Sequence, residues 1–175
     1  VSALARVTEH PNNQQALVMP LIAPAFGNLA GPPSLESCTR DVYAQDKRLG
    51  WLATLRMVRG MASATQHLHT RGILHGDLYA HNILHTAEGD ALLSDFGAAA
   101  FFDVNNTAQA KGLEQLEVRA LGCLLEELAT QCDATAHEAH LHHALTQLAQ
   151  ACMGDEPVQR PRLAQVCDAL KALHA

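Results

Sequence analysis

The sequence predicts a mainly α-helical α+β domain, a helical bundle with one small β-hairpin. From residue 49 onwards, apolar residues recur at three- and four-residue spacing, the pattern of amphipathic helices. Between two of these segments the spacing changes, and two short apolar runs flank a turn. At 175 residues, the chain is long enough for one domain with a sizeable core and too short for two.

The elements follow in order along the chain. Residues 16–19 form a short strand-like apolar run, and residues 20–33, rich in Gly, Pro and Ala, are typical of a connector. The first long amphipathic helix is predicted to begin near Leu49. It ends at Arg71 and Gly72, where a basic last turn meets a glycine able to adopt the left-handed conformation.

The second half alternates between a hairpin and helices. Residues 83–85 and 91–93 flank a turn and predict the hairpin. Apolar stripes predict helices over 113–128 and 163–173, and a further helix is expected over 137–153.

Composition and charge narrow the range of functions. The net charge of −6 offers no electrostatic footprint for a phosphate backbone, so a nucleic-acid partner is disfavoured. No apolar run approaches the roughly 20 residues needed to span a bilayer, so no membrane partner is expected. The 5 cysteines contain no C-x-x-C pair and are expected to be reduced thiols in helices, which favours a cytoplasmic location.

The chemistry is carried by residues 75–82, H-G-D-L-Y-A-H-N, and by S-D-F-G at 94–97. The carboxylate of Asp95 and the amide oxygen of Asn82 are hard ligands of the kind that Mg²⁺ prefers, and a hairpin between them can fold both towards one ion cluster. Asp77 is left to accept a proton from a substrate hydroxyl. Together these residues predict phosphoryl transfer.

This pattern resembles the protein-kinase catalytic loop H-R-D-L-x-x-x-N followed by D-F-G, with H-G-D in place of H-R-D. The resemblance implies that Asp77 is the catalytic base. It implies that Asn82 and Asp95 hold magnesium and thereby bind ATP, and that His75 packs against Phe96. The expected cofactors are ATP and Mg²⁺, and the expected partner is a protein substrate.

The resemblance covers essentially the whole chain. Residues 1–22 look like a remnant of the kinase N-lobe, with the end of its C-helix, its last strand and the hinge, and residues 23–175 look like the C-lobe. Met19 would be the gatekeeper, and the backbone of Pro20 and Ile22 would face adenine. Most of the N-lobe is expected to lie upstream of this chain, together with any further domains.

Two downstream segments extend the resemblance. Residues 117–122, E-V-R-A-L-G, resemble the start of the central C-lobe helix, usually D-V-W-S-x-G, and residues 159–161, Q-R-P, resemble the Arg-Pro pair that opens the last helix. Arg119 lies on the central helix and is expected to pair with a carboxylate.

Three departures from the family pattern stand out. Gly76 replaces the arginine with which most protein kinases sense activation-loop phosphorylation. Tyr79 replaces a lysine that reaches the transferred phosphate, and His81 is the candidate to assist in catalysis instead. The segment between Asp95 and Glu117 is too short for a normal activation loop and lacks A-P-E.

Three functions are compatible with these residues. The leading one is a bacterial-style serine/threonine protein kinase, present as a fragment that is inactive alone. The second is a small-molecule kinase of the aminoglycoside and choline kinase type, because H-G-D-L resembles that catalytic loop, although D-F-G and Arg160-Pro161 argue against it. The third is a pseudokinase that acts as a binding module, favoured by Gly76 and Tyr79.

Overall fold

The computed structural model describes residues 4–9, 11–12, 14–37 and 40–174, which form a mixed α+β structure as predicted. The helices are α1 (Trp51–His69), α2 (Thr107–Thr130), α3 (Ala139–Met153) and α4 (Leu163–Ala172). The strands are β1 (Ala5–Val7), β2 (Ala16–Val18), β3 (Gly27–Asn28), β4 (Leu49–Gly50), β5 (Ile73–Leu74), β6 (Ile83–His85), β7 (Ala91–Leu93), β8 (Ala100–Phe101) and β9 (Cys132–Asp133). Short 3-10 turns are η1 (Ala80–Asn82), η2 (Phe96–Ala98) and η3 (Pro157–Gln159).

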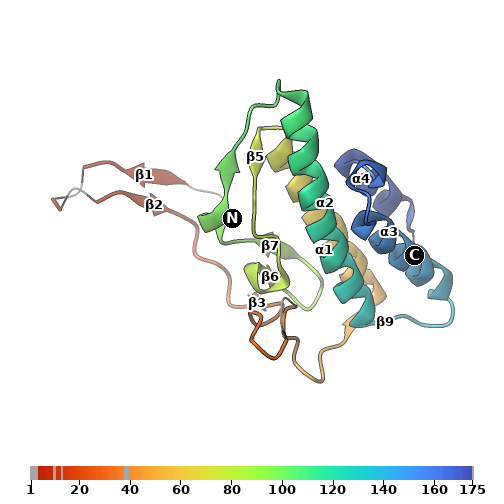
Figure 1. Ribbon diagram of the computed structural model, residues 1–175. Coiled ribbons are helices and arrows are strands. Elements are labelled where there is room, and N and C mark those ends of the chain that lie inside the picture. The colour runs from red at the N-terminus through yellow and green to blue at the C-terminus, as the bar shows by residue number, and fades with distance from the viewer. Residues whose placement is uncertain (1–3, 10, 13, 38–39, 175) are drawn as a thin grey trace.

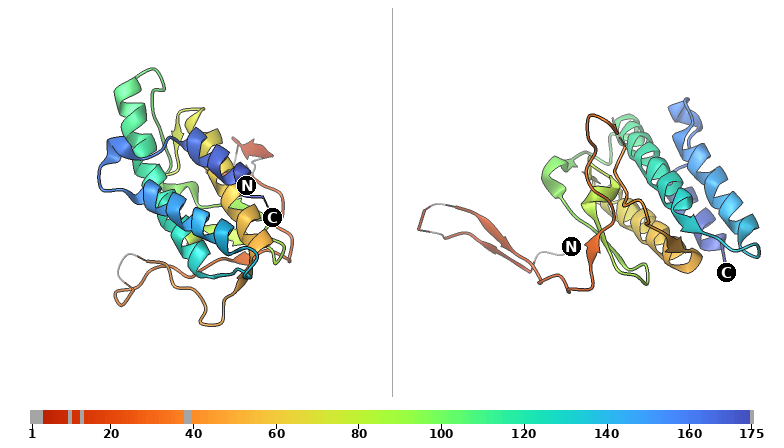
Figure 2. Two further views of the ribbon diagram at one scale, coloured as in Figure 1. Left: turned by 90° about the vertical axis from the view of Figure 1, so that its right-hand side faces the viewer. Right: turned by 90° about the horizontal axis from the view of Figure 1, so that it is seen from below.

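The helices form the core. Helix α1 packs against α4 and α2, and α2 packs along α3 (Figures 1 and 2). The buried residues of α1 recur every three or four positions: Trp51, Thr54, Leu55, Met57, Val58, Met61, Ala62 and Thr65. Each large apolar side chain buried in this way contributes about 1.5–3 kcal/mol to folding. In the described part of the chain, no helix is long and apolar enough to cross a membrane.

Helix α1 ends at His69, two residues before the predicted end at Arg71 and Gly72, and the turn that follows it closes at Gly72. Gly72 has a φ of 69°, in the left-handed region that favours glycine. A Cβ at this position would lie 2.5 Å from the backbone oxygen of Phe102. The chain then enters β5, which pairs antiparallel with β8. The glycine therefore fixes the direction in which the chain enters the loop at residues 75–82.

Strands β6 and β7 form the predicted hairpin, with Ile83 opposite Leu93. Strand β3 pairs with the other edge of β6, which completes a three-stranded antiparallel sheet. The tip of the hairpin lies on α1, because a Cβ at Gly89 would lie 2.3 Å from the backbone oxygen of Ala53. Gly89 also has a φ of 86°, so two independent constraints require glycine there.

The N-terminal segment corrects one prediction. The end of a C-helix was expected before the strand-like run, but the structure has β1, which pairs antiparallel with β2. Pro11 and Asn12 lie in a turn between the strands, and this turn allows the short segment at Ala5–Val7 to pair with its neighbour instead of coiling. Figure 1 shows this hairpin projecting away from the helical body. The boundary between residues 22 and 23 stays a prediction.

The connection from the hairpin to α2 is short, as predicted. It contains only η2, β8 and a turn before α2 begins at Thr107. The side-chain oxygen of Asn106 accepts a hydrogen bond from the backbone N–H of Gln109 (3.3 Å) and so caps the helix.

The cysteines are free thiols in the described part of the chain. Cys123, Cys152 and Cys167 lie in helices as expected, whereas Cys132 lies in β9. Cys38 lies outside the described residues.

Candidate active site

Asp77 and Asn82 are brought together by direct hydrogen bonds. The side-chain NH₂ of Asn82 donates to the backbone oxygen of Asp77 (2.9 Å) and to its carboxylate Oδ2 (2.8 Å). Asn82 is 4% exposed, so these bonds hold its amide in one orientation. Because both amide hydrogens are used on Asp77, the amide oxygen remains, and no described residue donates to it.

Asp95 is connected to the same pair through Ser94. The backbone N–H and the hydroxyl of Ser94 both donate to the backbone oxygen of Asn82, at 2.9 and 2.8 Å. Asp95 follows with a φ of 53°, the only non-glycine residue with positive φ in the described part of the chain. Aspartate tolerates this conformation better than most residues do, and the carboxylate Oδ1 accepts the N–H of Gly97 (3.1 Å). The hairpin thus returns Asp95 to Asn82.

His75 links the two halves of the site. Its ring packs edge-on against Phe96 with centroids 4.8 Å apart, as the sequence predicted. The ring Nε2 lies 3.0 Å from the backbone oxygen of Ser94, which can only accept, so Nε2 carries the proton. The ring Nδ1 then accepts the backbone N–H of Asp77 (3.3 Å). A fully buried imidazole therefore holds the loop and the D-F-G segment together.

Glu117 on α2 anchors the loop from behind. Its carboxylate accepts hydrogen bonds from the backbone N–H groups of Gly76 (2.8 Å) and His75 (3.3 Å) and from the ring of His69 (2.5 Å). Burial by itself would raise the pKa of the Glu117 carboxyl, but these hydrogen bonds outweigh burial and lower the pKa below its ordinary value. The carboxylate stays charged at neutral pH and orients the residues that precede Asp77.

Gly76 is required by the backbone path. Its φ is 80°, and a Cβ there would lie 2.6 Å from the backbone oxygen of Ala98. The arginine of the usual H-R-D motif does not fit this path without a shift of the chain. The departure noted in the sequence therefore has a structural cause.

His81 is held by a carboxylate that the sequence did not reveal. The side chain of Asp41 is fully buried and accepts the backbone N–H of His81 (2.9 Å) and the ring Nδ1–H (2.8 Å). The ring Nε2 is therefore the position left for chemistry. The centroid of the Tyr79 ring lies 5.7 Å from the centroid of the His81 ring. The predicted catalytic role of His81 stays a prediction.

The residues present fit a magnesium site. The donors are the free amide oxygen of Asn82 and the exposed carboxylate of Asp95, both hard oxygen ligands. Such an ion would supply charge neutralisation on the phosphates of ATP. Its few protein ligands are typical of Mg²⁺, which keeps several waters and shares its remaining positions with phosphate oxygens.

The residues predicted to face adenine lie on the segment that leads from β2 to the body. Met19 and Pro20 are exposed, and Ile22 is half-buried. Because they follow a hairpin that projects from the body, their assignment to adenine stays a prediction (Figure 1).

Sequence reasoning missed Asp41 as an anchor and gave no role to Glu117. Asp41 lies in an irregular segment without any pattern that marks it. For Glu117 a signal existed, because it is the acidic residue that opens the segment resembling D-V-W-S-x-G.

The comparisons with known proteins agree on one family. The family model described as "Protein tyrosine and serine/threonine kinase" matches residues 34–131, more than half of the chain. The chain is 24% identical over 163 residues to a Dictyostelium discoideum protein named "Probable LIM domain-containing serine/threonine-protein kinase", covering 74% of this chain and 25% of that protein. It is 31% identical over 114 residues to the serine/threonine-protein kinase WNG1 of Toxoplasma gondii, covering 58% of this chain and 18% of that protein.

The chain spans at most about a quarter of the length of these relatives. The match nevertheless includes the loop with Asp77 and Asn82, the D-F-G segment and α2 with Glu117. By its sequence match and by the residues described above, the chain belongs to the protein kinase family.

Proposed function

We propose that this chain carries the catalytic and metal-binding half of an ATP- and Mg²⁺-dependent protein kinase that phosphorylates serine or threonine hydroxyls. The observation that carries the proposal is one hydrogen-bonded unit. In it the amide of Asn82 holds Asp77, and Ser94 holds Asn82. This unit supports the proposal, because its hydrogen bonds connect the candidate base Asp77 to Asn82 and, through Ser94, to the segment that carries Asp95. The choice of serine or threonine rests on the printed names of the relatives.

In this proposal, each residue has a distinct task. Asp77 uses carboxylate Oδ1 to accept the proton of the attacking hydroxyl, because Oδ2 is engaged by Asn82. Asn82 and Asp95 present oxygens to the magnesium ion that neutralises phosphate charge. Glu117 and His75 keep the loop in place, so that the hydroxyl and the phosphate meet in line.

We further propose that residues 1–22 are the remnant of an N-lobe and that residues 23–175 form the C-lobe. Exposed apolar side chains support this, since Leu21 is 97% exposed and Met19 is 53% exposed on the segment assigned to the hinge. An ATP cleft that is closed on just one side stays open to water. Residues 1–175 alone are therefore expected to transfer phosphate very slowly.

The test is transfer from labelled ATP by the intact protein, with Mg²⁺ and generic protein substrates. Label on protein that falls at least a hundredfold in Asp77→Asn supports the proposal, because the amide cannot accept the proton. Full transfer by Asp77→Asn would refute the role of Asp77. Phosphorylation of metabolites without any protein product would instead favour the small-molecule kinase, and no nucleotide binding would favour the pseudokinase.

A further inference from the structure

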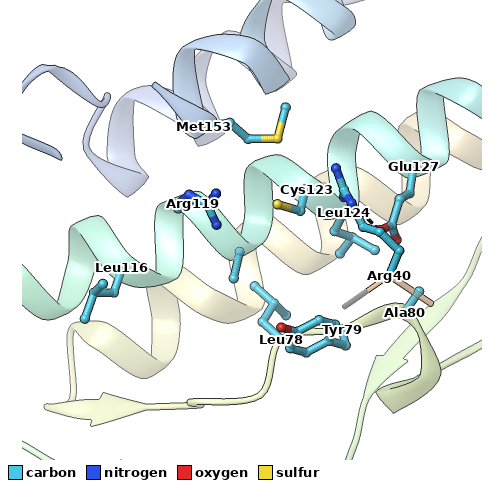
Figure 3. Close-up of a pocket in the computed structure, with 11 residues that line it drawn as sticks. Arg40, Leu78, Tyr79, Ala80, Leu116, Arg119, Cys123, Leu124, Glu127 and Met153 are labelled. Carbon is cyan, nitrogen blue, oxygen red and sulfur yellow. Dashed lines mark hydrogen bonds and ion pairs between the residues drawn. The ribbon is translucent and has the colours of Figure 1, made fainter. Parts of the chain in front are cut away.

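A pocket opens directly beside the proposed catalytic loop. It has a volume of about 280 Å³, and one wall is formed by residues 78–80, which follow Asp77. The opposite wall is one face of α2, with Leu116, Arg119 and Cys123 on successive turns (Figure 3). The backbone N–H of Tyr79 bonds the backbone oxygen of Asp77 (3.0 Å), so this wall lies next to the proposed base.

Two arginines line the pocket, and they differ in their partners. Arg40 binds Glu126 (2.6 Å) and Glu127 (2.9 Å). Glu127 also accepts the hydroxyl of Tyr43 (3.1 Å), so the carboxylate that lines the pocket is already engaged. Arg119 is exposed and has no ion pair with any carboxylate of the described residues, contrary to the sequence prediction. Its charge is therefore available to a ligand.

The remaining lining is largely apolar. Leu78 and Leu124 are buried beneath the pocket, whereas Leu116 at its edge is 63% exposed and Met153 at the end of α3 lies across from Arg119 (Figure 3). An exposed leucine next to an unpaired guanidinium suits a ligand that carries an apolar group next to a carboxylate.

We propose that this pocket selects the protein substrate, by binding an acidic side chain next to an apolar one close to the acceptor hydroxyl, with Arg119 as the specificity-determining residue. The proposal rests on the proposed function. The geometry fits, because Leu78, which directly follows Asp77, and Tyr79, whose N–H bonds the backbone oxygen of Asp77, both line the pocket. An acceptor hydroxyl at Asp77 therefore places its neighbouring residues at the pocket.

The test compares peptide substrates of the intact protein. One serine peptide carries glutamate and leucine around the serine, and matched peptides carry glutamine or lysine in place of glutamate. The glutamate peptide is expected to have the highest kcat/KM. Arg119→Gln is expected to lower its kcat/KM about tenfold, as loss of one charge-assisted hydrogen bond predicts, while the KM for ATP and the kcat/KM of the glutamine peptide stay unchanged. In Arg119→Glu, the lysine peptide is expected to have a higher kcat/KM than the glutamate peptide.

Lys111→Gln is the matched control, because it removes one positive charge from an exposed position of the same helix outside this pocket. A tenfold loss in Lys111→Gln as well would indicate a general charge effect and would overturn the role of Arg119. Equal kcat/KM for all three peptides in the unmodified protein would overturn the proposal outright.

A second readout separates this proposal from the proposed function. Cys123 lines the same pocket, so a bound peptide should slow its alkylation, measured by mass spectrometry in the absence of ATP. Protection by the glutamate peptide that is lost in Arg119→Gln, without any phosphate transfer, would support the pocket and reject the kinase activity. Phosphate transfer without Cys123 protection or peptide preference would reject the pocket and leave the activity standing.

Discussion

The carboxylate of Glu117 accepts the backbone N–H of Gly76 at 2.8 Å, which ties the central helix to the loop that carries Asp77. In Glu117→Gln, the new NH₂ group meets an N–H donor, so at least one of the three hydrogen bonds to this side chain is lost. We expect a loss of about 1–3 kcal/mol in the free energy of unfolding at pH 7. Urea denaturation of both proteins measures this difference, and an unchanged midpoint would contradict it.

Glu117 also predicts how the stability of the protein changes at acidic pH. The pKa of Glu117 lies below its ordinary value of 4.5 in the folded protein, so its charge stabilises the fold above that pH. This contribution is lost as the pH falls through the lowered pKa. The difference in Tm between the unmodified protein and Glu117→Gln is therefore expected to be constant from pH 7 to about pH 5 and to shrink in more acidic buffer. A difference that grows on acidification would argue against this linkage.

Gly76→Ala is expected to lower the free energy of unfolding by about 1–2 kcal/mol, because a left-handed φ is less favourable for alanine than for glycine. The clash with the backbone oxygen of Ala98, 2.6 Å from the new Cβ, should also displace Asp77 and lower kcat. Gly60→Ala is the control. It lies on the exposed side of α1 with open space around it, and there alanine should stabilise by up to about 1 kcal/mol. Thermal denaturation and measurements of kcat test this prediction. Equal effects of both substitutions on Tm and kcat would argue against backbone strain at residue 76.

Asn82→Ala is expected to raise the concentration of Mg²⁺ that gives half-maximal transfer at fixed ATP by at least about tenfold, because one of two oxygen ligands is lost. A magnesium titration of phosphate transfer by the intact protein measures this. Asn28→Ala, at an exposed position of the neighbouring strand β3, should leave the titration unchanged. A lower kcat with an unchanged titration would mean that Asn82 acts only by holding Asp77.

Asp41→Ala leaves the N–H and the ring Nδ1–H of His81 without their acceptor, so we expect a loss of about 1–3 kcal/mol in the free energy of unfolding. If the ring of His81 takes part in transfer through Nε2, Asp41→Ala and His81→Ala should lower kcat by the same factor and alter its pH profile alike. Asp46→Ala, at an exposed position five residues further along the chain, is the control and should change neither quantity. An intact kcat in His81→Ala would remove the predicted catalytic role.

Much of the fold was accessible from the sequence because its signals are local. The apolar residues of α1 recur within one helix, and the turn that follows the helix is marked by one residue, Gly72. The β6–β7 hairpin is likewise defined by two runs on either side of a turn. Strand β1 escaped prediction because Ala5–Val7 is a strand only through its pairing with β2, and three residues carry no period.

The site divides in the same way. Asp77, Asn82 and Asp95 were found because their spacing along the chain is a motif. Asp41 and Glu117 act on that motif from 40 and 41 residues away, and only the fold places their carboxylates under its backbone. The free charge of Arg119 was likewise invisible, because a pairing or its absence depends on which neighbours the fold supplies.

The contact of Gly89 with Ala53 has a consequence for the tolerance of the chain to sequence change. Gly89 is far along the hairpin from the phosphate-handling residues, yet the hairpin joins Asn82 to Asp95, and its tip can rest on α1 only without a side chain. A bulkier residue there would tilt both ends of the hairpin at once. In a saturation screen for function, Gly89 should therefore behave like a residue of the active centre, although it touches neither nucleotide nor substrate.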